Sequence, residues 1–234
     1  MIMAPSLNLI FVHIPKTAGS SVSFALVPHL DLEQDAFITN SIHAVGDPEK
    51  FTNADGIFLS EHATVGRCKR TLGPDKYRAM ISVAFVRNPF ARAWSSFSYS
   101  MLQASNPGPD AMAETVATYR RYCGDGFDAA LRNIDETAQH IPMFRPQTTW
   151  LPKPQMVTIL GRVETLQKDL DRVMTQLDLP VTKSPTENTS SAPGAWRGMS
   201  AYAADAIRDY YKSDFDTFGY DTETATAFPA GGQS

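Results

Sequence analysis

The stretch NLIFVHIPKTAGSSVSFALV, residues 8–27, joins an apolar run to a second apolar segment through a lysine, a glycine and several hydroxyl side chains. The run at 7–14 predicts a short strand, and the segment at 20–27 predicts a helix. Backbone N–H groups at a helix start have no partners within the helix, and the aligned peptide dipoles make that end electropositive. The stretch therefore predicts a strand–loop–helix unit whose loop can bind an anion.

The residues of this loop suit a phosphate ligand. Gly19 lets the backbone approach closely, Ser20 and Ser21 add hydroxyl donors, and Lys16 supplies a mobile positive charge. In the alternative interpretation, Ser20 only caps a helix and Lys16 is solvated. A Walker A loop places its lysine directly after its second glycine, whereas Lys16 precedes the only glycine here. The loop therefore differs from that of an ordinary NTPase.

Alternating strand and helix patterns continue along the chain. Short apolar runs predict further strands, and amphipathic stretches predict helices behind Pro89 and behind the capping residues Thr165 and Ser200. The predicted strands are 56–60, 80–86 and 156–160, and the predicted helices are 88–101, 165–177 and 200–211. This alternation predicts an α/β fold with a mostly parallel sheet.

A second basic cluster lies in FVRNPFARAWSSFSY, residues 85–99. Arg87 follows the predicted strand 80–86, where open α/β sheets bind ligands outside the carboxyl ends of their strands. Arg92 and Ser95 lie three residues apart on the following helix and share a face. An arginine at a strand end and a serine one turn into a helix can bind a phosphate together. Taken alone, the segment favours the simpler interpretation of an arginine–carboxylate pair and a surface serine.

Composition limits the classes of protein. The 234 residues, 43% of them hydrophobic, predict one globular domain, and the net charge of -4 argues against a general nucleic-acid binder. Cys68 and Cys123 have no CxxC spacing, so neither a disulfide framework nor a zinc site is predicted from them. The N-terminus lacks a basic segment, and no run reaches the roughly 18 apolar residues of a membrane span. We therefore expect a cytoplasmic protein; the oligomeric state is not indicated.

PKTAGSS together with R-x-P-x-x-R-x-x-S at 87–95 resembles the two signatures of sulfotransferases that use 3′-phosphoadenosine 5′-phosphosulfate (PAPS). The closer resemblance is to the carbohydrate sulfotransferases that include the heparan 2-O and chondroitin 4-O enzymes. It continues in MFRPQTTWL (143–151), ILGRVETLQKDL (159–170) and DYYKSDFDTFGY (209–220). The resemblance implies a P-loop-NTPase-like three-layer fold without NTPase activity. It also implies a single sulfotransferase domain over 1–221, with a flexible tail at 222–234.

The same resemblance implies roles for individual residues. The loop would hold the 5′-phosphosulfate, with Lys16 as the catalytic lysine, and Arg87 and Ser95 would bind the 3′-phosphate. The loop residues are Lys16, Thr17, Ala18, Gly19, Ser20 and Ser21. Relatives often have threonine where Ser20 stands, which keeps the hydroxyl. Arg197, in a long loop at 180–198, lies where relatives close over the adenosine and can add a positive charge. PAPS would be the donor and 3′-phosphoadenosine 5′-phosphate (PAP) the product, with no metal required.

Transfer to a hydroxyl group also needs a base. His62, in FLSEHATVG, follows the strand predicted at 56–60, and the family has a catalytic histidine in a comparable segment. We therefore predict His62 as the base, with Glu61, His43 and His140 as alternatives. His13 is expected to be a packed, hydrogen-bonded histidine at a strand end. In the segment 143–151, Arg145 and Gln147 are candidates to orient the acceptor or brace the phosphate loop.

The expected acceptor is a hydroxyl group of a sugar, glycan or glycolipid. The alternatives are a non-catalytic nucleotide-binding module of the same fold and a P-loop-like kinase, although the kinase's Walker A lysine and magnesium ligands are not visible. A glycosyltransferase would need a metal-binding carboxylate pair. The two D-x-D strings, at 169–171 and 214–216, carry a core-type residue between the carboxylates and are predicted to be structural.

Overall fold

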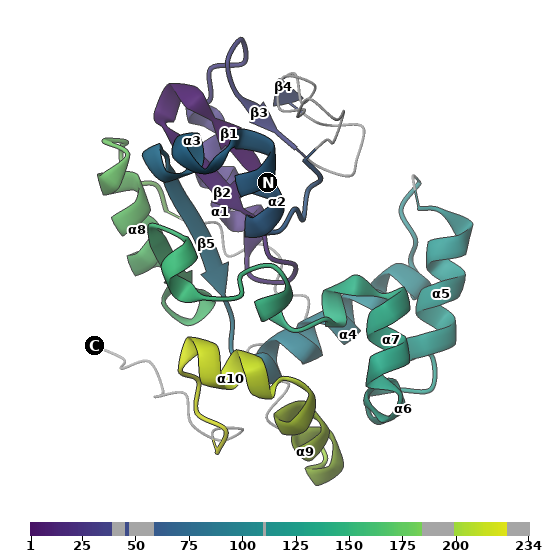
Figure 1. Ribbon diagram of the computed structural model, residues 1–234. Helices are drawn as coiled ribbons and strands as arrows, with labels where there is room; N and C mark the ends of the chain where they lie inside the picture. Colours follow the sequence, from purple (N-terminus) through teal and green to yellow (C-terminus); the bar gives the residue numbers. More distant parts are fainter. Residues whose placement is uncertain (39–44, 47–58, 110, 184–198, 224–234) are drawn as a thin grey trace. The chain divides into compact units, whose positions relative to one another are not determined.

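The computed structural model describes residues 1–38, 45–46, 59–109, 111–183 and 199–223, and Figure 1 shows their elements. The chain divides into two compact units. We call Met1–Arg87 with Gln147–Asn188 the sheet unit, and Asn88–Pro146 with Thr189–Ser234 the helical unit. Arg197 and His43, which were predicted as site candidates, and the tail beyond residue 223 lie outside the described residues.

The described residues of the sheet unit form a six-stranded sheet in the order β4-β3-β1-β2-β5-β6. Pairs β1–β2, β1–β3 and β3–β4 are antiparallel, whereas β2–β5 and β5–β6 are parallel. The strands are β1 (Ile2–Ala4), β2 (Leu9–Val12), β3 (Ala36–Phe37), β4 (Val45–Gly46), β5 (Ile81–Val86) and β6 (Ile159–Arg162). The prediction of an α/β fold is confirmed, but that of a mostly parallel sheet is wrong, because most of the strand pairs are antiparallel.

A hairpin at the N-terminus is the main reason for this difference. Strand β1 turns back into β2 through a 3-10 turn, η1 (Pro5–Leu7), and Asn8 closes it in the left-handed region at φ 51°. The N–H of Asn8 donates to the carbonyl of Pro5 at 3.1 Å. Asparagine tolerates this conformation better than most residues, so the turn is locally encoded. A three-residue strand, however, is too short to show an alternating pattern.

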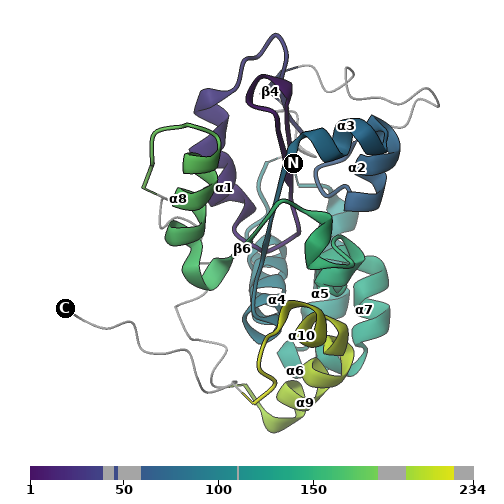
Figure 2. The ribbon, with the colours of Figure 1, turned by 60° about the vertical axis from the view of Figure 1, so that its left-hand side comes forward.

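Helices cover both faces of the sheet in this unit, which gives it three layers (Figure 2). Helices α1 (Gly19–Leu26) and α8 (Leu166–Gln176) cover one face, and α2 (Val65–Leu72) and α3 (Pro74–Ala79) cover the other. In β5, Val83 and Phe85 pack in the core beneath α1 and α8. Ala84 and Val86, which point to the opposite face, are equally buried. The nearly continuous apolar run at 80–86 is therefore confirmed as a strand covered on both faces.

Other predicted elements of the sheet unit differ in detail. The helix predicted at 20–27 is α1, and the strand predicted at 156–160 is β6, displaced toward the C-terminus by a 3-10 turn, η6 (Pro154–Met156). At 56–60, residues 59 and 60 are not in a strand, and 56–58 lie outside the described residues. Thr165 precedes α8, but its hydroxyl donates to Asp169 Oδ2 at 2.6 Å instead of capping the helix.

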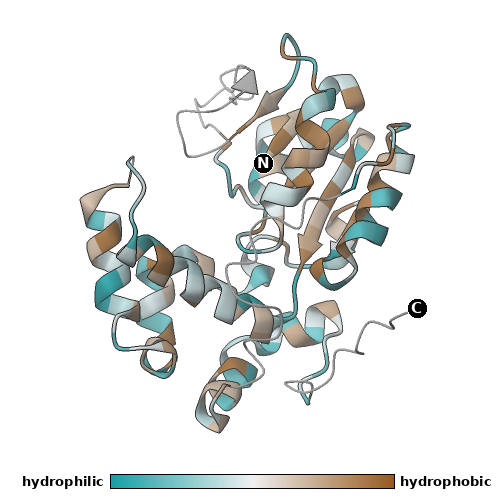
Figure 3. Cartoon of the chain, turned by 180° about the vertical axis from the view of Figure 1, so that it is seen from behind, coloured by the Kyte–Doolittle hydropathy of each residue, from teal (hydrophilic) through white to brown (hydrophobic). Residues whose placement is uncertain are grey.

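In the part of the helical unit that the structure describes, six helices pack around a core of their own. They are α4 (Pro89–Ser105), α5 (Ala113–Cys123), α6 (Phe127–Arg132), α7 (Ile134–His140), α9 (Ala201–Tyr210) and α10 (Lys212–Phe218). Two predicted starts are confirmed: Asn88 accepts from the N–H groups of Phe90 and Ala91, and Ser200 accepts from that of Ala203. Hydrophobic and hydrophilic residues alternate along the helices of both units (Figure 3). Among the described residues, the helices are all too short or too polar to cross a membrane.

Short 3-10 turns complete the described structure. Besides η1 and η6 they are η2 (Val27–His29), η4 (Pro142–Phe144), η5 (Gln147–Thr149) and η7 (Val163–Thr165). Turn η5 belongs to the sheet unit and follows directly after the helical unit's segment 88–146.

Candidate functional site

The loop between β2 and α1 has an unusual backbone. Lys16 and Ala18 lie in the left-handed region at φ 66° and 61°. Residues with a side chain pay about 1–2 kcal/mol for this conformation, and such strain is typical of functional sites. Buried Thr17 fixes the turn, because its hydroxyl donates to the carbonyl of Ile14 at 2.8 Å. The loop is therefore held in one shape by the fold around it.

Helix α1 begins at Gly19, with Ala18 as its N-cap residue and no side chain capping it. Ser20 is thus inside the first turn, which rules out the interpretation that its only role is to cap the helix. Its side chain is exposed, whereas Ser21 is buried. The first N–H groups of the helix have no acceptor within it, so this end of α1 offers donors to an anion next to half-buried Lys16.

Gly19 packs against the imidazole ring of His13, at the end of β2. A Cβ atom on Gly19 would lie 1.7 Å from His13 Nε2, so only glycine fits. The His13 ring also stacks on Phe11, with centroids 5.8 Å apart. His13 is packed as predicted, but its buried Nδ1 has no hydrogen-bond partner among the described residues.

His62 lies beside His13, and its ring is oriented by the backbone. Nδ1 of His62 lies 2.9 Å from the carbonyl oxygen of His13. A carbonyl only accepts, so Nδ1 carries the proton and Nε2 of the neutral ring holds a lone pair. The main chain is held as well, because the indole Nε1 of Trp150 donates to the carbonyl of His62 at 3.0 Å. The side chain of His62 remains 31% exposed, so the lone pair can reach a ligand.

Glu61 brings its carboxylate close to both histidines. Its Oε1 lies 3.5 Å from His13 Nδ1 and 4.0 Å from His62 Nε2. Burial, followed by nearby positive charges that include Lys16, lowers the pKa of His13 well below its usual 6.5. Within the described ranges, these three side chains are the ones whose donor atoms are grouped closely enough to hold a metal ion.

Arg87 directly follows β5, and a glutamine side chain holds its backbone. Gln147 Oε1 accepts from the Arg87 N–H at 2.8 Å, and Gln147 Nε2 donates to the Arg87 carbonyl at 2.9 Å. Gln147 is fully buried in η5. These two bonds imitate the pairing of a neighbouring strand and extend the ordered backbone one residue beyond β5.

Topology brings these groups to one edge of the sheet. Strands β2 and β5 are parallel neighbours, with Val12 opposite Ala84. The Lys16 loop follows the carboxyl end of β2, and Arg87 follows the carboxyl end of β5. Since carboxyl ends of parallel strands meet at the same edge, the loop and Arg87 lie at the edge where such sheets bind ligands.

Other predicted residues belong to the helical unit. Ser95 is buried in α4. Arg92 is fully buried, and its guanidinium donates to the carbonyls of Met143 and Arg145 at 3.0 and 2.9 Å. Arg145 in turn donates from Nε to the carbonyl of Ala138 at 3.0 Å. Both arginines therefore support the backbone of their own unit.

The remaining candidates are His140 and the two D-x-D strings, and the hydrogen bonds of His140 and Asp169 lie outside the edge formed by β2 and β5. His140 Nδ1 lies 3.0 Å from the carbonyl oxygen of Glu136 within α7. Asp169 accepts from the backbone N–H of Arg162 at 2.9 Å, and Asp214 is buried in α10. Asp169 and Asp214 therefore have structural surroundings, in agreement with the prediction for the D-x-D strings.

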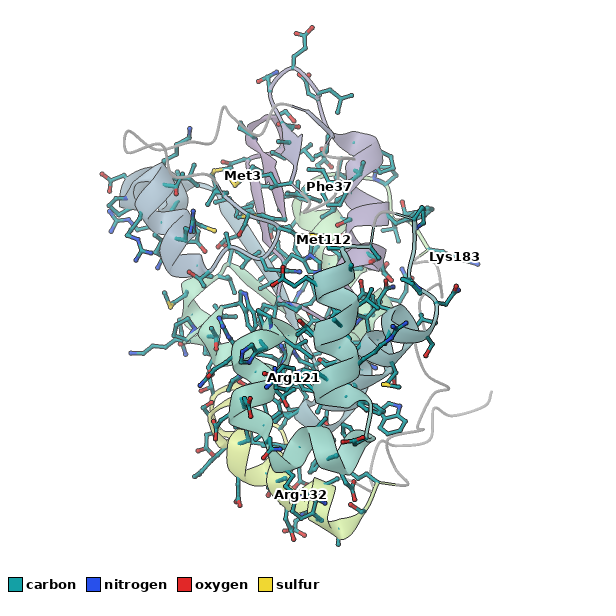
Figure 4. The ribbon with its side chains drawn as sticks, turned by 90° about the vertical axis from the view of Figure 1, so that its right-hand side faces the viewer. Met3, Phe37, Met112, Arg121, Arg132 and Lys183 are labelled. Carbon is teal, nitrogen blue, oxygen red and sulfur yellow. The ribbon has the colours of Figure 1, made fainter. Side chains whose placement is uncertain are left out.

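A depression in the helical unit carries charges of both signs. Arg121 and Arg132 lie on its exposed surface (Figure 4), and the Tyr122 hydroxyl donates to Glu136 at 3.1 Å. The depression is lined by Arg121, Tyr122, Asp125, Ala129, Arg132, Asn133, Glu136 and Thr137. None of the predicted site residues is among them.

The sequence predicted site roles for the loop, Arg87 and His62, but it predicted none for Trp150, and it predicted His13 only as a packed, hydrogen-bonded residue. Gln147 and Trp150 lie three residues apart in a turn, and nothing in the local sequence predicts that their side chains bond to the backbones of Arg87 and His62.

Comparison with known proteins gives one match. A model of the Sulfotransferase family matches residues 1–221, which include every described strand and helix. No curated protein and no solved structure matches the chain.

Proposed function

The chain belongs to the sulfotransferase family, and from this premise we propose that it moves the sulfuryl group of PAPS to a hydroxyl group of a sugar, glycan or glycolipid. Residues 1–221 would act as one sulfotransferase domain. The observation that carries the proposal is the edge shared by β2 and β5, where a rigid anion-binding loop with Lys16 and the clamped Arg87 follow adjacent parallel strands. The three layers of the sheet unit and its strand–loop–helix start support a P-loop-like fold.

In this proposal the donor is held at both of its phosphate ends. The N–H groups at the start of α1, the hydroxyls of Ser20 and Ser21, and Lys16 bind the 5′-phosphosulfate. Arg87 binds the 3′-phosphate, and the family pattern adds Ser95 and Arg197 to that role. Arginine suits this task because its planar guanidinium can donate two parallel hydrogen bonds to a phosphate.

Transfer would occur in line at sulfur. The acceptor oxygen forms a bond to sulfur while the bond from sulfur to the 5′-phosphate oxygen breaks, and PAP leaves with the electron pair of that bond. Lys16 stabilises the negative charge that develops on the leaving oxygen. The proton of the acceptor hydroxyl passes to Nε2 of His62, whose lone pair is left available by the Nδ1–H bond to the His13 carbonyl.

The proposal is tested by calorimetric titration with PAP, 5′-AMP and ATP, which needs no knowledge of the acceptor. We expect PAP to bind about 10- to 100-fold more tightly than 5′-AMP, since charge-assisted hydrogen bonds contribute about 1.5–3 kcal/mol. Arg87→Ala should remove this preference, and Arg70→Ala, which removes an exposed arginine on α2, should keep it. Equal or tighter binding of ATP, seen only with magnesium, would overturn the proposal in favour of a kinase or NTPase.

A transfer assay tests the catalytic role of the loop. Lys16→Ala should abolish turnover of PAPS, whereas Lys76→Ala, which changes an exposed lysine of α3, should leave it unchanged. Turnover at the wild-type rate in Lys16→Ala would refute the role of Lys16.

A further inference from the structure

We propose that His13, Glu61 and His62 form a binding site for a divalent transition-metal ion such as Zn²⁺, and that this ion competes with proton transfer for the same nitrogen of His62. The donor atoms of the three residues lie within 4.8 Å of one another. The site goes beyond sulfuryl transfer, which requires no metal in the scheme above. It is therefore a site for an inhibitory ion.

The chemistry of the three donors matches zinc. Two imidazoles and one carboxylate are a donor set of catalytic zinc sites, which leave a fourth position open. With bonds of about 2.0–2.2 Å, tetrahedral donors lie about 3.3–3.6 Å apart. The separation of His13 Nδ1 from Glu61 Oε1, 3.5 Å, already fits, and that of His62 Nε2 from Glu61 Oε1 is 4.0 Å. The three donor atoms lie within 4.8 Å of one another, so binding requires the partly exposed Glu61 and His62 side chains to move toward His13.

The two histidine rings are already oriented for an ion. Histidines that bind metals almost always donate their second ring N–H to a carbonyl or carboxylate. His62 does so, with Nδ1 on the carbonyl of His13. The ring of His13 is held between Phe11 and Gly19, which fixes the direction of its Nδ1. The ring of His13 is therefore already fixed, and the ring of His62 starts from a defined orientation.

An unsatisfied nitrogen supplies an independent reason for a ligand. His13 Nδ1 is buried and has no hydrogen-bond partner among the described residues. A buried polar atom without a partner is unfavourable, and a metal ion would satisfy it. The positive charge of Lys16 nearby opposes a dication, so Lys16→Met is expected to tighten metal binding.

Co²⁺ provides a direct test, because it takes the place of Zn²⁺ and shows intense visible absorption when four-coordinate. Titration of the whole chain without PAPS should give one saturable band that Zn²⁺ abolishes. Glu61→Gln and His62→Gln should each weaken Co²⁺ binding at least about tenfold. The control His140→Gln, which removes an exposed histidine of α7, should bind as the wild type does.

The outcomes separate this site from the proposed function. The absence of a saturable band, or equal affinity in the wild type and both site variants, would overturn the metal site. Preferential binding of PAP without a Co²⁺ band would leave the donor proposal intact and refute this one. A Co²⁺ band without preference for PAP would leave the metal site intact and refute the donor proposal. Two site variants are used so that a failure of one to fold still leaves the other to decide.

Discussion

Replacing Gly19 by alanine would place a methyl group inside the imidazole ring of His13. The new Cβ would lie 1.7 Å from Nε2 and 2.1 Å from Cδ2, whereas ordinary van der Waals contact begins at 3.4 Å. The ring has little room to withdraw, since it stacks on Phe11 and has His62 on another side, with centroids 4.5 Å apart. Overpacking of this kind costs about 1–3 kcal/mol. For a chain of this size that lowers the melting temperature by about 2–12 °C.

Thermal unfolding followed by circular dichroism measures this change. Gly66→Ala is the matched control, because a Cβ there meets only Thr64 Oγ1, at 3.8 Å. Alanine at that helical position restricts the unfolded chain, so the control should retain or raise stability by about 0.5–1 kcal/mol. Adding His13→Ala to Gly19→Ala should cost less than the sum of the single changes, since the clash disappears with the ring. A Gly19→Ala protein that melts at the wild-type temperature, or strict additivity in the double variant, would refute the close contact.

Three further changes test other parts of the sheet unit. Trp150→Phe removes the indole that donates to the backbone carbonyl of His62, and it should lower kcat about tenfold while the affinity for PAP stays unchanged. The control is Trp94→Phe, because the indole nitrogen of Trp94 has no hydrogen-bond partner among the described residues, and it should change neither quantity. Gln147→Leu frees the backbone of Arg87 and should reduce the preference for PAP over 5′-AMP in calorimetry. Burial raises the pKa of Cys68 from 9.0 to about 12, so between these pH values the thiol ionises in the unfolded chain but stays protonated in the folded one. The stability is therefore complete below pH 9, and the urea midpoint of unfolding should fall as the pH rises from 9 toward 12. The fall should be smaller in Cys68→Ala.

The sequence predicted those elements whose signals are local. A proline after a capping asparagine starts α4 at Pro89, and the glycine of the loop starts α1. The buried strand β5 was predicted from an apolar run long enough to be distinctive. In each case, neighbouring residues alone determine the backbone.

Other elements depend on partners far along the chain. Strands β3 and β4 have two residues each, and strands of this length form only by pairing with a neighbour: β3 pairs with β1, and β4 pairs with β3. Helices α6 and α7 have six and seven residues, which is shorter than the window of about 11 residues over which helical periodicity is read from a sequence. The antiparallel half of the sheet therefore had no counterpart in the sequence patterns.

In the candidate site, too, local sequence predicts the residues with reactive side chains but not the residues that hold them in place. His62 bonds the carbonyl of His13, 49 residues away, and Trp150 bonds the carbonyl of His62, 88 residues away. Gln147 bonds the backbone of Arg87 across 60 residues. An insertion in any intervening loop would change these separations and leave the bonds intact, so no fixed spacing can encode them. The backbones of the proposed base and of the proposed 3′-phosphate-binding arginine are thus both held from a single turn, residues 147–150, that carries no reactive group. Substitutions in that turn should therefore act as substitutions in the site.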